Sequence, residues 1–181
     1  MASIFFPDNS VLCSFASVDE LDLLEGHLRG RGRWTEAIVV EVEASFSREE
    51  GLRSLVERKW LGEPVRVDTV EAAQEVEFIR RTVFRGKQPG PDQWRRHLGE
   101  SETIYVIQHR SEYRSAFWVS EDRKSLQYAT SIGIHTRETI DMVRGIVEDG
   151  TLTAQEGFRL MQRMREAGRG MRMPNSPEDF A

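Results

Sequence analysis

The chain has 181 residues, 39% hydrophobic and 30% charged, with a formal net charge of −5 at pH 7. This length and composition are typical of one folded domain and exclude a wholly disordered protein. The negative balance excludes a uniformly basic surface, so any contact with nucleic acid must use a local patch.

Cysteine content and hydropathy exclude two further classes. Cys13 is the only cysteine, which rules out an internal disulfide framework and a cysteine-based zinc site. No apolar run reaches the ~18–20 residues needed to span a bilayer. The apolar start of the chain has no basic leader and runs directly into Pro7, unlike a signal peptide. We therefore expect a soluble, cytoplasmic protein with no membrane partner.

In the first half of the chain, periodicity and capping residues predict alternating strands and helices. The predicted elements, in order, are a strand at 3–6, a helix at 21–28 behind a capping box at 17–20, a helix capped by Thr35, a helix from the capping box at 47–50 to about Lys59, a short strand at 65–67, and a helix from Asp68 to Val83.

The second half continues this alternation after a Gly- and Pro-rich loop at 86–91. The predicted elements are a helix at 98–110, a strand at 117–119, a helix at 125–130, a strand at 132–134, a helix at 136–148, and a last helix behind the capping box at 153–156. Residues 169–181 are expected to form a flexible tail. The pattern predicts a single α/β domain over residues 1–168, with a small parallel sheet flanked by helices.

Four carboxylates occupy positions that solvation does not explain. Asp8 and Asp122 each follow a predicted strand, at the sheet edge where ligands and chemistry are usually placed. Glu41 lies in an apolar helix segment, and Glu102 lies between apolar residues of a later helix. Each position alone has a plain structural explanation, such as a helix cap, but the four together favour a functional site.

Carboxylates brought together repel each other, and burying them is costly unless a partner balances the charge. Few lysines stand near these positions in the sequence. An all-oxygen set of ligands selects a hard divalent ion, Mg²⁺ or Mn²⁺. Such an ion activates water and stabilises charge on a phosphoryl oxygen.

Several short segments carry a family resemblance. They are Phe-Pro-Asp-Asn-Ser-Val-Leu at 6–12, Val-Val-Glu-Val at 39–42, Leu-Gly-Glu-Ser-Glu-Thr-Ile at 98–104, and Trp-Val-Ser-Glu-Asp-Arg at 118–123. In their order and spacing, the chain resembles PIN-domain ribonucleases of the kind that act as toxins in VapBC-type toxin–antitoxin pairs. The resemblance implies a PIN-like α/β/α sandwich, metal-dependent endoribonuclease activity with Mg²⁺ or Mn²⁺, an RNA substrate, an antitoxin protein partner and a homodimer.

The resemblance also implies roles for individual residues. The metal-binding and catalytic acids would be Asp8, Glu41, Glu102 and Asp122. The supporting residues would be Asn9, Glu100 and Ser120. Glu102 is a glutamate where the family more often has aspartate, and residues two apart on a helix point in different directions. We prefer Glu102 to Glu100 because the apolar residues Ile104 and Val106 follow it.

One basic stretch, at residues 80–97, is a candidate for holding RNA phosphates. The predicted RNA-binding residues are Arg81, Arg85, Arg95 and Arg96. A solvated helix and loop would explain the same charges. The basic residues of the whole chain are 22 Arg and 3 Lys, and nucleotide bias in the source genome explains that ratio better than RNA binding does.

Two alternative functions remain open at this point. A PIN-like nucleic-acid-binding module without hydrolysis would bind RNA and leave it uncut with Mn²⁺. A glycosidase with a carboxylate pair would cleave sugars in the presence of a chelator, although a chain this short with no aromatic groove fits that class poorly.

Overall fold

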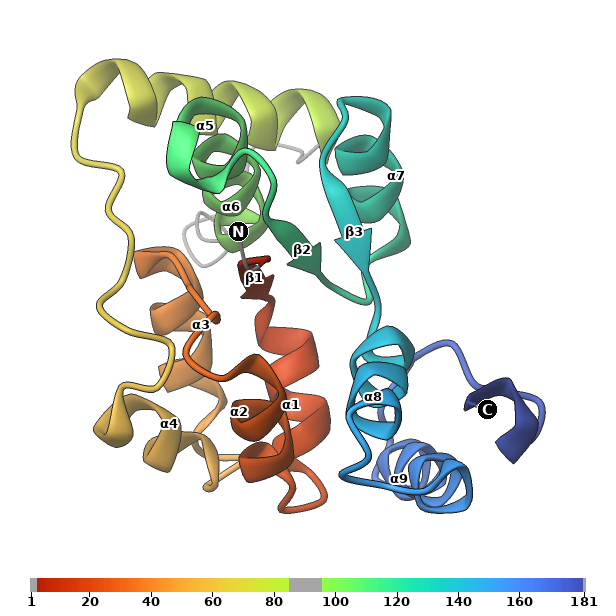
Figure 1. The fold of residues 1–181 in the computed structure, drawn as a ribbon. Helices are drawn as coiled ribbons and strands as arrows, with labels where there is room; N and C mark the ends of the chain where they lie inside the picture. The colour runs from red at the N-terminus through yellow and green to blue at the C-terminus, as the bar shows by residue number, and fades with distance from the viewer. Residues whose placement is uncertain (1–2, 85–95, 181) are drawn as a thin grey trace.

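The computed structural model describes residues 3–84 and 96–180. It contains a three-stranded parallel sheet in the order β1-β2-β3. The strands are β1 (Phe5–Pro7), β2 (Phe117–Val119) and β3 (His135–Arg137). Helices surround this sheet, and in Figure 1 β1 leads directly into α1 while β3 leads into α8. The predicted α/β class with a small parallel sheet is confirmed.

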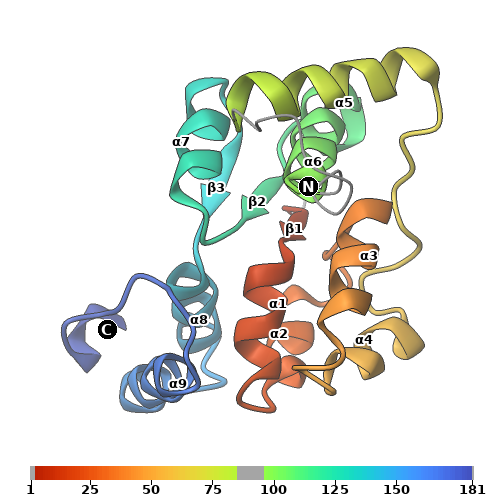
Figure 2. The ribbon, with the colours of Figure 1, turned by 180° about the vertical axis from the view of Figure 1, so that it is seen from behind.

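The helices that surround the sheet are α1 (Asn9–Ala16), α2 (Leu21–Leu28), α3 (Glu36–Ser45), α4 (Leu52–Arg58), α5 (Val70–Val83), α6 (Leu98–His109), α7 (Arg123–Ser131), α8 (Thr139–Glu148) and α9 (Ala154–Glu166). Short 3₁₀ helices, η1 (Ser111–Tyr113) and η2 (Pro177–Phe180), complete the described elements. Figure 2 shows from behind that α5, α6 and α7 lie on one side of the molecule and α1–α4, α8 and α9 on the other.

Alternate side chains of the strands point into two separate hydrophobic cores, as the pleat of a sheet requires. Phe5 and Val119 belong to the core that α1–α4, α8 and α9 cover. Phe6 and Trp118 belong to the core that α5, α6 and α7 cover. Both faces of β1 and β2 are therefore buried, which explains why these two strands are apolar, whereas the edge strand β3 is polar and largely exposed.

The segment at residues 31–33 pairs with β1 on the side away from β2. The Phe5 N–H donates to the Arg31 carbonyl at 3.0 Å, and the Arg33 N–H donates to the Phe5 carbonyl at 2.8 Å. This pairing covers the β1 edge and leaves β3 as the opposite edge of the described sheet.

Several sequence predictions are confirmed where a side-chain cap and an apolar face agree. Thr35 caps α3, and Thr153 with Glu156 forms the capping box of α9. α5, α6 and α7 lie within a few residues of their predicted bounds. The buried face of α5 contains Ala72, Val76 and Ile79, as predicted.

Other local predictions are wrong. α1 was not predicted; it has only eight residues, and six of them, Val11–Ala16, are buried. Ser17 follows the end of α1 instead of starting α2, and α4 begins only at Leu52, with no side-chain cap. The third strand is at 135–137, not at 132–134, because Gly133 has a positive φ of 84° and turns the chain first.

The C-terminal segment packs against the body of the protein, contrary to the predicted tail. Phe180 is buried beside Gly157 of α9. Arg172 forms an ion pair with Glu138, with Nε and Oε2 3.0 Å apart. Phe180 joins the core on the α8 and α9 side, so residues 169–180 contribute to the fold.

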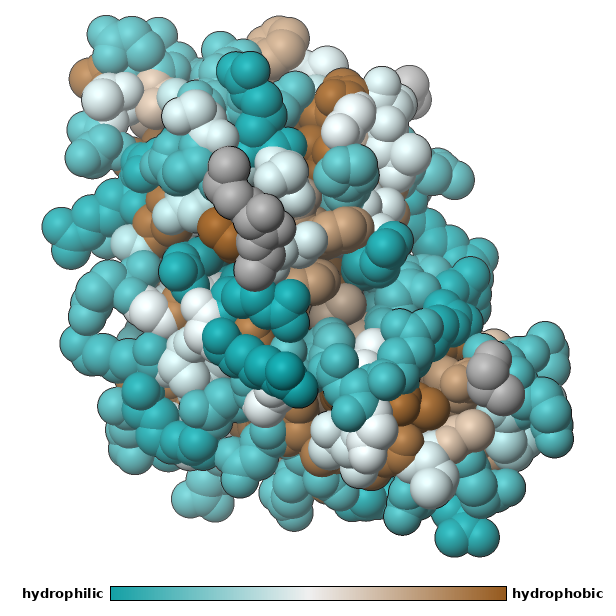
Figure 3. All heavy atoms as spheres, viewed as in Figure 1, coloured by the Kyte–Doolittle hydropathy of each residue, from teal (hydrophilic) through white to brown (hydrophobic). Residues whose placement is uncertain are grey.

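Hydrophilic side chains cover most of the face shown in Figure 3, and the hydrophobic ones form smaller areas between them. Within residues 3–84 and 96–180, no helix has both the length and the apolar character to cross a membrane.

Helices α2 and α8 approach closely at Gly145. A Cβ atom at this position would lie 2.5 Å from Cε1 of His27, whose ring is held by Asp149. We predict that Gly145→Ala destabilises the protein by about 1–3 kcal/mol, the usual cost of overpacking. Gly26→Ala in α2 is the matched control, since a Cβ there meets no atom within 4 Å. It should gain about 0.5–1 kcal/mol. Urea unfolding of both variants tests the prediction, and equal stabilities would contradict it.

Candidate functional site

Asp8 stands where β1 ends. Its backbone N–H donates to the Val119 carbonyl at 2.8 Å, which extends the pairing of β1 with β2 by one residue. The residue is only 7% exposed. Its Oδ2 accepts hydrogen bonds from the Ser10 hydroxyl at 2.7 Å and the Ser120 hydroxyl at 3.4 Å. Its Oδ1 is buried and has no hydrogen-bond partner within the described part of the chain.

Glu41 of α3 reaches toward the same place from the side. Its Oε1 accepts a hydrogen bond from the Gly99 N–H, in the first turn of α6, at 3.3 Å. A Cβ on Gly99 would lie 2.8 Å from that oxygen and 2.5 Å from Cδ1 of Ile38. Glycine at 99 therefore permits the close contact of α3 with α6 that brings Glu41 in.

Glu100 of α6 is the third acid of this cluster. Its Oε1 lies 3.0 Å from Nδ1 of His97. The His97 ring stacks on Phe84, with 4.7 Å between ring centroids. His97 has a positive φ of 62°, a conformation uncommon for a residue with a side chain. The contact with His97 orients the Glu100 carboxyl in this arrangement.

Burial and mutual repulsion raise the pKa values of two of these acids. Burial, and then the charge of Glu100, raise the pKa of Asp8 to about 6. Burial, followed by the charges of Asp8 and Glu100, raises the pKa of Glu41 to about 8. Among the described residues, no Lys or Arg forms an ion pair with Asp8, Glu41 or Glu100. The three carboxyls, Asp8, Glu41 and Glu100, are called the acid cluster below.

Glu102, the predicted metal ligand of α6, makes a different local contact. Its Oε2 accepts a hydrogen bond from the Ala37 N–H at 3.0 Å, in the first turn of α3. Burial raises the pKa of Glu102, while the Ala37 hydrogen bond lowers it. The charge of Glu102 acts on Glu41 less than those of Asp8 and Glu100 do. Glu100 is therefore the closer electrostatic partner of the cluster.

Asp122 also points to a helix terminus. Its Oδ1 accepts a hydrogen bond from the Ser125 N–H at 2.7 Å and so caps α7. Ser120 connects it to the cluster, because the Ser120 hydroxyl donates to Asp8 and accepts from the Asp122 N–H at 3.1 Å. Glu121, which the sequence analysis did not single out, accepts from the Thr139 N–H at 2.7 Å at the start of α8.

Asn9 follows Asp8 but faces the packing of α1 against α3. Its Nδ2 donates to the Ser45 hydroxyl at 3.1 Å. Its Oδ1 lies 3.4 Å from Sγ of Cys13. The contact with Ser45 joins α1, which begins directly after Asp8, to α3, which carries Glu41. Asn9 therefore supports the site through helix packing.

The predicted basic rim is only partly within the described residues. Arg81 donates to Glu77 at 2.5 Å, so its charge is paired. Arg96 is exposed. Arg85 and Arg95 lie outside the described residues.

No group of three His, Cys, Asp or Glu side chains within residues 3–84 and 96–180 is arranged to hold a metal ion as it stands. Comparison with models of protein families, with curated proteins and with solved structures finds no match. The site must therefore be interpreted from its own chemistry.

The raised pKa of Glu41 predicts a pH-dependent stability. The folded chain holds this proton up to about pH 8, whereas an unfolded Glu releases it near 4.5. Stability should therefore fall as pH rises through this window. In Glu41→Gln, which keeps an acceptor for Gly99, the fall in Tm between about pH 5 and about pH 8.5 should be smaller by roughly 4–8 °C.

The control for this prediction is Glu43→Gln, an exposed position on the same helix. Its Tm should follow the wild-type pH dependence, measured by thermal unfolding with a chelator present. Parallel curves for wild type and Glu41→Gln would show that Glu41 titrates as an ordinary surface acid.

Proposed function

We propose that this protein is a metal-dependent endoribonuclease that cleaves RNA phosphodiester bonds, with the acid cluster binding Mg²⁺ or Mn²⁺. The observation that carries the proposal is the Oδ1 atom of Asp8. Within the described residues this oxygen is buried without a hydrogen-bond partner, and the charges of Glu41 and Glu100 interact with that of Asp8. Leaving such an atom unpaired is costly, and a cation would provide the missing partner.

The chemistry of the donors fits a hard divalent ion. Asp8, Glu41 and Glu100 offer only oxygen ligands, and they come from three different elements of the fold. Within the described residues these side chains are not grouped to hold an ion, so binding would require them to come closer together. A divalent ion bound there would acidify a water molecule and neutralise charge on a phosphate oxygen.

The residues of the chain have distinct parts in this proposal. Asp8, held by Ser10 and Ser120, is the fixed ligand. Glu41 and Glu100 are the adjustable ones, and His97 orients Glu100. Glu102 and Asp122 cap α3 and α7 and so position the helices around the site.

The wider biology follows the PIN-domain resemblance. A small parallel sheet with a core on each face, and acids at the ends of its strands, supports a PIN-like sandwich. On this basis we propose a cytoplasmic toxin of a VapBC-like pair, with an antitoxin protein as its partner and a homodimer as its form.

One observation favours a second candidate, a nucleic-acid-binding module without hydrolysis. The described acids do not form a ready group of three ligands, and Glu41 keeps its proton to about pH 8. A protein of this kind would bind RNA and leave it intact with Mn²⁺.

Substitutions at the acids test the nuclease directly. Asp8→Asn should reduce Mn²⁺-dependent cleavage of a labelled RNA by at least roughly 100-fold, and Glu100→Gln by at least roughly tenfold, because each removes a charged ligand. Glu102→Gln should retain cleavage within about threefold and lose less than about 1 kcal/mol of stability, because Gln keeps an acceptor for the Ala37 N–H and only the negative charge at the start of α3 is removed. Undiminished cleavage by Asp8→Asn would remove the mechanism. RNA binding by wild type without any cleavage would favour the second candidate.

Metal binding has a readout that does not require activity. At about pH 8, millimolar Mn²⁺ should raise the Tm of the wild type, since a ligand that binds only the folded state stabilises by about 2.7 kcal/mol at 100 times its Kd. Asp8→Asn should show no such rise, while Glu43→Gln should respond as wild type does. Equal Mn²⁺ shifts in all three proteins would place the ion elsewhere.

A further inference from the structure

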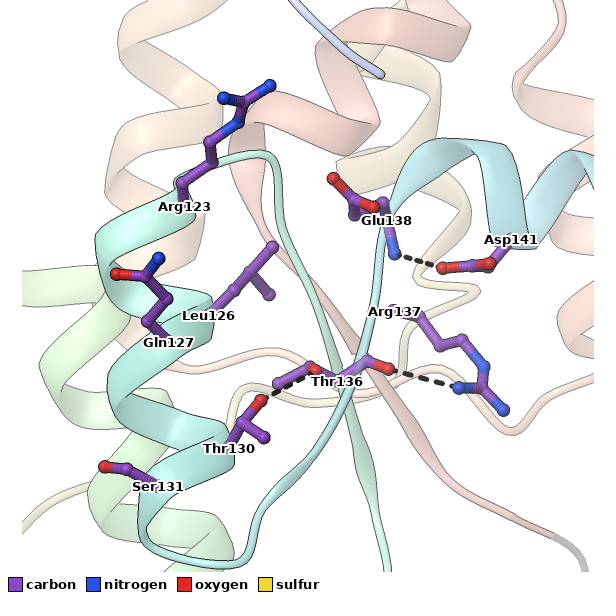
Figure 4. A pocket seen from close by; sticks show the side chains of 9 residues that line it. All are labelled: Arg123, Leu126, Gln127, Thr130, Ser131, Thr136, Arg137, Glu138 and Asp141. Atoms are coloured by element: carbon purple, nitrogen blue, oxygen red, sulfur yellow. Dashed lines mark hydrogen bonds between the residues drawn. The ribbon is translucent and has the colours of Figure 1, made fainter. Parts of the chain in front are cut away.

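A polar groove lies at the free edge of the sheet, between α7 and the junction of β3 with α8. It encloses about 530 Å³. Figure 4 shows that Gln127 and Thr130 of α7 form one wall, with β3 and the start of α8 opposite. The hydroxyls of Thr130 and Thr136 lie 3.2 Å apart and join α7 to β3.

The acidic side chains that line the groove have partners, whereas its arginines have no carboxylate partner in the described residues. Its two carboxylates are engaged, because Glu138 and Asp141 form the capping box of α8 and both lie within ion-pair distance of Arg172. Its two guanidinium groups, Arg123 and Arg137, have no carboxylate partner within the described residues. Arg137 stacks on Phe117, 4.6 Å from the ring centroid, and donates only to the Thr136 carbonyl at 3.3 Å. The rim of the groove therefore carries two guanidinium groups, with Arg123 pointing outward from α7 and Arg137 extending from β3 away from α7 (Figure 4).

The groove is connected to the acid cluster through Ser120. The Ser120 N–H donates to the Arg137 carbonyl at 3.1 Å, and its hydroxyl contacts both Asp8 and the Asp122 N–H. Arg123 directly follows Asp122. Arg137 is thus one backbone hydrogen bond away from Ser120, which holds Asp8, and Arg123 follows Asp122, whose N–H bonds the same Ser120 hydroxyl.

We propose that this groove binds the RNA strand next to the bond that is cut, with Arg123 and Arg137 contacting two different phosphates. The identity of the ligand rests on the proposed function. Guanidinium groups suit phosphate oxygens. In Figure 4 the two groups point in different directions from α7 and β3 and do not converge, which fits separate phosphates along a strand better than a single anion. The amide and hydroxyls of the walls supply hydrogen bonds to sugar or base.

Binding without metal tests the groove independently of catalysis. In fluorescence anisotropy with a labelled single-stranded oligoribonucleotide and EDTA, Arg123→Ala with Arg137→Gln should weaken binding at least roughly tenfold. The slope of log affinity against log salt should decrease by about 0.7 for each lost phosphate contact. The single variant Arg123→Ala, at an exposed residue without an ion-pair partner in the described residues, should account for about half of this change and leave Tm unchanged.

The matched control is Lys124→Ala, which removes an exposed cation beside Arg123 that does not line the groove. Its affinity should stay within about twofold of wild type. Wild-type affinity and salt slope in the double variant would overturn the inference. Equally tight, arginine-dependent binding of polyglutamate would also overturn it, by making the groove a site for acidic protein segments.

The two proposals fail in different ways. If wild type cleaves RNA and the arginine variants bind and cleave as well as it does, only the groove is wrong. If Asp8→Asn and wild type bind RNA equally through the arginines and neither cleaves with Mn²⁺, only the nuclease is wrong.

Discussion

The site depends on one constraint, the burial of the Asp8 carboxyl at the junction of β1 with α1. The pairing of β1 with β2 fixes its backbone, and two serine hydroxyls satisfy one of its oxygens. The other oxygen is left without a partner in the described structure. A buried acid in this state is tolerated by keeping its proton or by gaining a cation, and both responses change with pH and metal.

The contact of α3 with α6 adds the remaining acids to this constraint. Gly99 lets the helices approach until Glu41 accepts a hydrogen bond from the first turn of α6. The same turn carries Glu100, held by His97. The cluster is therefore a product of helix packing, since three elements separated in the chain deliver one carboxyl each. Its raised pKa values are the electrostatic consequence of that packing.

Ser120, at the end of β2, contacts both the acid cluster and the residues of the groove between α7 and β3. On one side it holds Asp8, and on the other its backbone and hydroxyl contact the residues that begin the α7–β3 groove. The acid cluster thus lies on one side of the end of β2, and on the other lies a groove whose two arginines have no carboxylate partner in the described residues. In the proposed function, an RNA strand would contact both regions at once. A metal ion would balance the negative charge of the acid cluster, and the arginines would balance the charge of the phosphates.

The sequence by itself determined the α/β class, the helices with strong caps and apolar periods such as α5 and α9, and the unusual positions of Asp8 and Glu41, because these depend on short-range patterns. It did not reveal α1, which is short and mostly buried, or the third strand after Gly133. Only the tertiary structure decided between Glu100 and Glu102, because both lie in one helix and the packing of α3 sets which of them faces Asp8 and which caps Ala37. It also decided which arginines are paired, since the pairing of a surface charge depends on the side chains around it: Arg81 pairs with Glu77, whereas Arg123 and Arg137, at the rim of the groove, have no carboxylate partner in the described residues.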